Sequence, residues 1–118
     1  MFSYQKLEVY KKSFLINKII YNLIKGNPQI PSYFKNQLGR ASLSVQLNIA
    51  EGSAKVSHKD RKNFYVIARG SAFECASIVE FLGAENEISV DIVQELNLGL
   101  EEISKMLYVM IRNLEKKV

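Results

Sequence analysis

The last third of the chain carries the pattern that most limits its fold, because apolar residues recur there at steps of three and four. The 3-4-3-4-3-4 spacing is followed without interruption by Val93, Leu96, Leu100, Ile103, Leu107, Met110 and Leu114. Such spacing puts one apolar stripe along a helix and is typical of a bundle or coiled-coil seam. The stripe must be buried against other helices, so the sequence predicts helix-on-helix packing.

Three further helices are predicted upstream, at about residues 4–25, 31–54 and 58–87. Gly26 or Asn27 can take a left-handed cap after the first helix. Ser57 and Ser89 are expected to cap the third and fourth helices. The predicted core-facing residues of the second helix are Phe34, Leu38, Ala41, Val45 and Asn48. Those of the third are Phe64, Ile67, Ser71, Cys75, Ile78 and Leu82.

Short connections between four helices predict one all-α domain over residues 1–118, an antiparallel up-down four-helix bundle. Small residues are frequent in the second and third helices, so these two are expected to pack at close range. The first helix carries Leu7, Tyr10, Phe14 and Tyr21 at helical spacing, with further Ile and Leu residues widening its apolar face. This surplus predicts self-association, because a monomeric bundle of this size would not need so many apolar residues on one helix.

Charge is distributed unevenly along the 118 residues, whose formal net charge is +4. Residues 1–70 hold twelve Lys/Arg against three Asp/Glu, a balance of +9, and residues 71–118 hold four against nine, a balance of −5. The first part could attract a polyanion and the second could not. An equally weighted interpretation is that opposite charges meet between helices or subunits.

Several locations and chemistries are disfavoured by composition. The charged N-terminal segment does not resemble a signal peptide, and the apolar runs are shorter than the roughly 18 to 20 residues of a membrane span. The single cysteine fits a reducing compartment. We therefore expect a soluble, cytoplasmic protein with no membrane partner.

Few residues of the sequence could act as catalytic groups or metal ligands. A di-iron bundle needs Glu-x-x-His pairs, and the one histidine, His58, has Lys55 three residues before it. An Arg-x(4–6)-His ribonuclease motif would need Arg at one of positions 51–53, which are Glu, Gly and Ser. Cys75 lies on the apolar seam and is expected to be a buried, inert thiol. The sequence thus predicts no enzyme, no metal and no cofactor.

Basic residues form the remaining candidate site. The proposed phosphate contacts are Lys11, Lys18, Lys25, Lys55, His58, Lys59, Arg61 and Lys62. The first three lie seven residues apart and form one stripe along a helix, and the others surround the connection between the second and third helices. Amide groups at a helix N-terminus add to the attraction for an anion. A solvated charged corner without a ligand is an equally good interpretation of these residues.

A polar line runs along the second helix through "NIAEG", residues 48–52. We predict a buried network that fixes helix register, with arginines meeting carboxylates. Its members would be Arg40, Ser44, Asn48 and Glu51 on the second helix and Arg69, Ser71 and Glu74 on the third. A ligand site is the less favoured alternative, because buried polar groups without partners are destabilising.

The same region carries a family resemblance. The stretch "QLGRASLSVQLNIAEGSAKVSHKDRKNFYVIARGSAFE" resembles the central motif of the bacterial four-helix-bundle family encoded in intervening sequences of 23S rRNA genes, once labelled a ribosomal protein. The matching residues are Gln37, Arg40, Ala41, Ser44, Asn48, Ile49, Ala50, Glu51, Gly52, Phe64, Ala68, Arg69, Gly70, Ser71, Ala72 and Glu74. The two ends of the chain also resemble the ends of that family.

The resemblance implies a homopentamer, a short barrel of five bundles around a channel, without enzymatic activity. It also implies similarity to the accessory variability protein of diversity-generating retroelements, a pentamer that associates with a reverse transcriptase and nucleic acid. Two functions follow as hypotheses. One is binding of RNA or DNA backbone through the basic surface, and the alternative is a protein–protein scaffold or adaptor that binds a partner protein and no nucleic acid.

Overall fold

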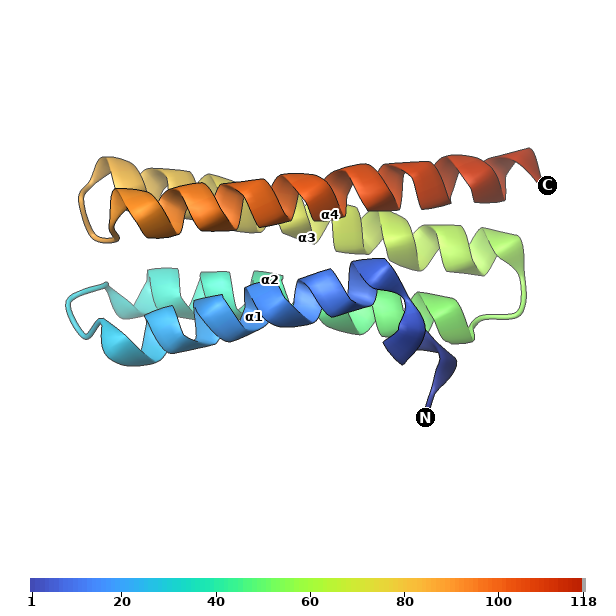
Figure 1. Cartoon of the computed structure of the whole chain (residues 1–118), viewed down its shortest axis with the longest axis horizontal. Helices are drawn as coiled ribbons and strands as arrows, with labels where there is room; N and C mark the ends of the chain where they lie inside the picture. Colours follow the sequence, from blue (N-terminus) through green and yellow to red (C-terminus); the bar gives the residue numbers. More distant parts are fainter. Residues whose placement is uncertain (118) are drawn as a thin grey trace.

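Four α-helices fill almost the whole chain in the computed structural model, which describes residues 1–117 (Figure 1). A 3₁₀ turn, η1, spans Ser3–Lys6 and precedes α1 at Glu8–Gly26. The other helices are α2 at Ser32–Ala54, α3 at His58–Ala84 and α4 at Val90–Lys116. No strand occurs among residues 1–117. The predicted all-α class and the predicted number of helices are confirmed.

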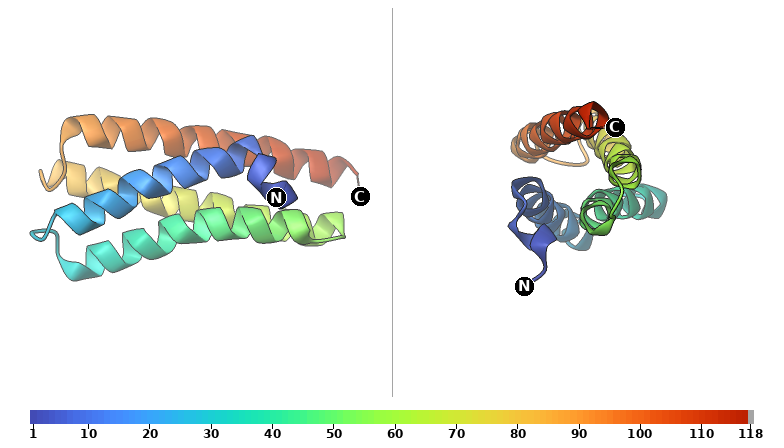
Figure 2. Two further views of the ribbon diagram at one scale, coloured as in Figure 1. Left: turned by 60° about the horizontal axis from the view of Figure 1, so that its bottom comes forward. Right: turned by 90° about the vertical axis from the view of Figure 1, so that its right-hand side faces the viewer.

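The helices alternate in direction, so that each connection joins antiparallel neighbours (Figure 1). Contacts occur between α1 and α2, α2 and α3, α3 and α4, and α4 and α1, which closes the bundle (Figure 2). The molecule measures 47 × 26 × 22 Å. One end of the bundle holds both termini and the α2–α3 connection, and the opposite end holds the α1–α2 and α3–α4 connections.

Local side-chain hydrogen bonds explain where the helices begin. The Ser57 hydroxyl accepts from the backbone N–H of Asp60 at 3.1 Å, and the Ser89 hydroxyl accepts from that of Ile92 at 3.3 Å. Both serines are therefore the N-caps that the sequence predicts. Each satisfies one of the backbone donors that a helix start leaves without an intrahelical partner.

The helix ends differ from the prediction. Asn27 has φ −129°, so no left-handed cap follows α1, and its side chain instead donates to the Leu23 carbonyl at 2.7 Å. The left-handed residue is Asn86, at φ 60° after α3. Beside it, the Glu87 N–H reaches the Leu82 carbonyl and the Asn86 N–H reaches the Gly83 carbonyl, the bond pair of a Schellman motif. This motif ends α3 at Ala84, three residues before the predicted end.

The seam predicted along α4 is largely confirmed. Leu96, Leu100, Ile103, Leu107 and Leu114 are buried, while Val93 and Met110 are half-buried. Ile111, which does not belong to the predicted seam, is also buried. The regular leucine spacing left little choice of face, which explains the success here.

The core faces of α2 and α3 are rotated by about one position from the prediction. The buried residues of α2 are Leu38, Ala41, Ser42, Val45, Ile49 and Gly52. Those of α3 are Tyr65, Ala68, Ala72, Cys75, Val79 and Leu82. Asn48 is half-buried beside the core, and Ile49 takes the fully buried place predicted for Asn48. Small residues make two adjacent stripes similar in hydrophobicity, so packing between helices decides which one turns inward.

The wide apolar face of α1 is divided between the core and the surface. Val9, Ser13, Ile16, Ile20 and Leu23 point into the core. Phe14 and Tyr21 instead remain 47% and 62% exposed. Because apolar residues surround most of this helix, either face could have been buried. The consequence is an outward-facing apolar surface along α1.

The close approach of α2 and α3 depends on Gly52. A Cβ atom at this position would lie 2.7 Å from Cε1 of Tyr65 and 3.0 Å from Cβ of Phe64. Tyr65 is only 4% exposed, so its ring has little room to move away. The absence of a side chain at Gly52 thus sets the spacing of these helices, as the abundance of small residues predicts.

Gly52→Ala is expected to lower the free energy of unfolding by about 1–3 kcal/mol, because the added methyl group overpacks the α2–α3 contact. Gly70→Ala is the matched control, since a Cβ there meets nothing within 4 Å. The control should be neutral or stabilising by up to about 1 kcal/mol, from helix propensity. Urea unfolding followed by circular dichroism measures both, and equal stability of the two variants would contradict this packing.

Candidate nucleic-acid interface

The α2–α3 connection brings together five of the predicted basic-site residues. Arg61 is half-buried, and its Nε donates to the Lys55 carbonyl at 2.6 Å. This hydrogen bond joins the start of α3 to the end of α2 across the connection. The Lys55 ammonium lies over the Phe64 ring, 5.0 Å from its centroid. His58 and Lys59 are exposed in the first turn of α3. Lys59 makes no ion pair within residues 1–117, so its charge is available to a ligand.

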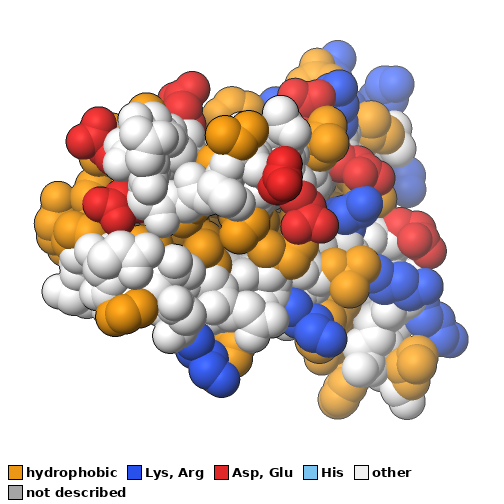
Figure 3. All heavy atoms as spheres, turned by 60° about the vertical axis from the view of Figure 1, so that its left-hand side comes forward, with side chains coloured by type: hydrophobic (Ala, Val, Ile, Leu, Met, Phe, Trp, Pro, Cys, Tyr) orange, Lys and Arg blue, Asp and Glu red, His pale blue; other side chains and the backbone are white. Residues whose placement is uncertain are grey.

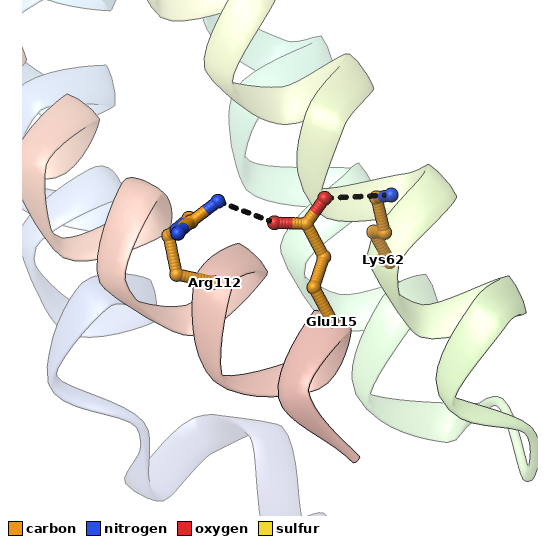
Figure 4. A network of polar contacts seen from close by, with 3 residues as sticks. All are labelled: Lys62, Arg112 and Glu115. Atoms are coloured by element: carbon orange, nitrogen blue, oxygen red, sulfur yellow. Dashed lines mark hydrogen bonds and ion pairs between the residues drawn. The ribbon is translucent and has the colours of Figure 1, made fainter. Parts of the chain in front are cut away.

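The fifth of these residues, Lys62, links the α2–α3 connection to the end of α4. Its ammonium lies 3.0 Å from one carboxylate oxygen of Glu115, whose other oxygen is 3.4 Å from Arg112 (Figure 4). The hydrogen bond from Lys62 and the charge of Arg112 lower the pKa of Glu115, so this carboxylate stays ionised. One acid is thus shared by two cations, which leaves a net positive charge.

The lysine stripe of α1 does not join this cluster as a single patch. Lys11 lies in the first turn of α1, near the terminal end of the bundle, and its ammonium is 3.4 Å from Glu8. Lys18 and Lys25 follow along the helix toward the opposite end, where Lys25 lies over the Tyr21 ring at 5.1 Å. The three lysines share a face, but only Lys11 lies in the half that contains the α2–α3 connection.

Basic residues at the end of α4 complete the cluster, and the sequence analysis missed them. Arg112, Lys116 and Lys117 lie in the part of the chain that was assigned an acidic balance. Lys105, near the middle of α4, pairs instead with Glu101 at 3.1 Å. The antiparallel path returns the end of α4 beside the start of α3, as the Lys62–Glu115 contact shows. The position of these residues could have been predicted from the expected topology, because an up-down bundle of four helices places both termini at one end.

Cutting each helix at its midpoint divides the bundle into two halves of opposite charge. The half with the termini, which we call the basic end, comprises residues 1–17, 43–71 and 103–117 and holds twelve Lys/Arg against four Asp/Glu, a balance of +8. Residues 18–42 and 72–102 form the acidic end, with four against eight, a balance of −4. In Figure 3, acidic side chains lie over the near end and most basic ones toward the receding end.

The predicted polar network exists only in part. The hydroxyls of Ser44 and Ser71 lie 2.8 Å apart and join α2 to α3. The Asn48 amide donates to the Ser44 carbonyl at 2.8 Å and to the Ser44 hydroxyl at 3.0 Å. These three residues form a small satisfied network beside the core, which supports a role in register.

The expected arginine–carboxylate pairs are not formed within one chain. Arg40, Glu51 and Glu74 are exposed and make no ion pair within residues 1–117. Arg69 turns toward α4, where its Nε donates to the Ser104 carbonyl at 3.2 Å. The prediction that arginines and carboxylates meet in a buried network is therefore wrong for the single chain, because the rotation of α2 and α3 turns these residues outward.

A second polar network, which the sequence analysis missed, joins α1 to α2. The Asn17 amide donates to the Gln46 side-chain carbonyl at 2.7 Å, and the Gln46 amide donates to the Tyr10 hydroxyl at 3.0 Å. Isolated Asn and Gln residues among apolar neighbours are the only signal for it. The two hydrogen bonds thus connect α1 to α2 beside the core.

The groups considered for catalysis lie apart. Cys75 is buried, as predicted. Burial raises the pKa of its thiol to about 12, with a further contribution from the Glu74 charge. His58 is solvent-exposed, as expected. Among residues 1–117, no three His, Cys, Asp or Glu side chains gather as metal ligands would. None of the helices in that range is both long and apolar enough to cross a bilayer.

These features define a small helical-bundle protein with one strongly basic end and a polar contact between its two central helices. Residues 5–109 match the 23S rRNA-intervening sequence protein family, and the chain belongs to this family. The predicted resemblance is thereby confirmed.

A solved structure with the same fold comes from Bacteroides thetaiotaomicron VPI-5482, a protein of unknown function from the S23 ribosomal protein family. It is 30% identical to this chain, and the match covers 87% of this chain and 97% of that one with a TM-score of 0.83. No curated protein matches the chain.

Asn48→Leu removes both amide hydrogen bonds and is expected to lower stability by about 0.5–1.5 kcal/mol, or to broaden the assembly state, before it changes nucleic-acid affinity. Asn22→Leu, at an exposed position of α1, is the matched control. Thermal unfolding and native mass spectrometry measure the first effect, and fluorescence anisotropy measures the second. Normal stability and assembly with lost binding would instead make Asn48 part of a ligand site.

Proposed function

We propose that this protein binds the phosphate backbone of RNA or DNA through its basic end, as a non-enzymatic homo-oligomer. The observation that supports binding is the +8 balance of that end against −4 at the other. Positive charge concentrated on one surface attracts a polyanion and orients it. Lys59, Lys116 and Lys117 are exposed and make no ion pair within residues 1–117, so they can meet phosphates directly.

The expected binding is driven mainly by charge. The α3 N-terminus lies within the basic cluster, and its backbone N–H groups add to the attraction for phosphate. Flexible lysine side chains neutralise phosphates without reading base edges. Affinity should therefore depend strongly on salt concentration and weakly on sequence.

Self-association is supported by apolar surface on α1 and α2. Phe14, Leu15, Tyr21, Leu43 and Leu47 are all between 47% and 62% exposed. A groove of about 320 Å³ between the two helices is lined by Phe14, Tyr21 and Leu43 among others. Contiguous apolar surface of this kind marks interfaces between proteins. We propose a homopentamer, with the number five taken from the family resemblance.

Assembly would strengthen weak contacts. Five copies of a +4 chain carry about +20, and five basic ends would repeat around a ring. Neutralising roughly five phosphates on duplex DNA gives a slope of about −4.5 for log affinity against log salt. Affinity should then fall by about 500-fold between about 50 and 200 mM salt.

The alternative function is a scaffold or adaptor that binds a partner protein and no nucleic acid. Two separate features favour it. All eight acids of the acidic end lie within residues 72–102, on α3, α4 and their connection, where they could meet a basic partner. The apolar groove between α1 and α2 offers a second surface for a protein contact. The two functions differ in which end of the bundle contacts the ligand.

Charge reversal at each end separates them. Lys59→Glu combined with Lys116→Glu is expected to weaken binding of a labelled RNA by about tenfold or more at about 50 mM salt, and to reduce the salt slope by about 1 for each lost phosphate contact. Lys25→Glu combined with Lys35→Glu makes the same charge change at the acidic end and is the control. It should have a much smaller effect.

Fluorescence anisotropy of the RNA gives both affinities, and native mass spectrometry checks that each variant assembles normally. If the intact wild-type oligomer binds no RNA at the lower salt concentration, backbone binding is excluded and the scaffold function gains. Equal losses in the two double variants would show that net charge, and not the basic end, controls the affinity.

A further inference from the structure

A groove of about 500 Å³ lies between α3 and the last turns of α4. Its lining includes Arg69, Gly70 and Phe73 from α3 and Tyr108 and Arg112 from α4. Most of these residues belong to the basic end. The groove thus lies beside the phosphate-binding surface proposed above but is lined by aromatic rings as well as cations.

The Arg69 guanidinium lies over both aromatic rings. Its guanidinium carbon lies 4.9 Å from the centroid of the Phe73 ring and 5.3 Å from that of Tyr108. Its Nε is anchored by the hydrogen bond to the Ser104 carbonyl at 3.2 Å. The rings remain 56% and 50% exposed, so part of each can accept another flat group.

Gly70 keeps the floor of this groove open. A Cβ atom there would meet nothing within 4 Å, in contrast to the crowded position of Gly52. The packing of α3 therefore does not need a glycine at position 70. The missing side chain instead leaves open space where Gly70 lines the groove.

The charges of the groove fit an anionic ligand with a flat, apolar part. Glu115 is the one acid among the groove-lining residues, and both of its oxygens contact cations, Lys62 and Arg112 (Figure 4). Arg112 is 57% exposed, and its 3.4 Å contact to Glu115 leaves other N–H groups directed to solvent. Aromatic rings beside arginines are the combination with which proteins hold unpaired bases and their phosphates.

We propose that the groove between α3 and α4 binds an unpaired base of a single-stranded nucleic acid, which stacks on Phe73 and Tyr108 while Arg112 contacts its phosphate. The inference rests on the proposed function and adds a ligand class to it, because the bases of a duplex are already stacked and paired. A single-stranded segment would run from the groove onto the lysines of the basic end.

An oligonucleotide with and without bases tests this contact directly. The probes are a labelled strand of about 15 thymidines and an abasic strand of the same length and charge. Phe73→Leu and Tyr108→Leu should each weaken binding of the thymidine strand by at least about fivefold and leave the abasic strand unaffected. Tyr33→Leu, which alters a 64% exposed ring at the acidic end, is the control and should change neither affinity.

Gly70→Leu tests the groove without removing a ring. The leucine side chain should fill the open space and weaken thymidine-strand binding by a similar factor, while helix stability is kept or raised. Gly26→Leu is the matched control, because its Cβ also meets nothing within 4 Å and it lies at the other end of the bundle. Native mass spectrometry of every variant reports the assembly state.

Three outcomes would overturn the inference. Equal affinity for the two strands, unchanged in Phe73→Leu, would leave backbone binding intact and exclude base stacking. No binding of either strand at about 50 mM salt would remove the proposed function itself. A lower assembly mass in Gly70→Leu or Phe73→Leu would show that a second copy of the chain covers this groove.

Discussion

The antiparallel order of the helices is the constraint on which the charge distribution of this protein depends. Short connections leave each helix no choice but to return beside its predecessor. The start of α3 and the end of α4, far apart in sequence, therefore meet at one end, where Lys62 and Arg112 share Glu115. A chain whose bases and acids are separated along the sequence becomes a bundle with one basic end and one acidic end.

The fold could be read from the sequence to a large extent. The leucine spacing of α4 and the serine caps of α3 and α4 depend on local physics, and each was predicted correctly. The inward faces of α2 and α3 were not, because adjacent stripes on these helices are similarly apolar or small. Gly52 shows how packing decides between them, since the absence of a Cβ atom there lets the Tyr65 ring lie against the α2 backbone.

The candidate site was predictable only in part, for a related reason. Lys55, Lys59 and Arg61 are close in sequence and remain close in space. The contributions of Arg112 and Lys116 depend on tertiary contacts that no local pattern encodes. The polar line through Asn48 was half correct, because Ser44 and Ser71 meet across the helices whereas Arg40 and Glu74 face solvent.

Native mass spectrometry of protein purified at low salt shows whether the basic end holds nucleic acid. With nuclease omitted, we expect a mass above that of five 13.5 kDa chains, which falls to the mass of the protein oligomer after nuclease treatment. An identical mass before and after nuclease, with no nucleic acid absorbance in the untreated sample, would contradict it.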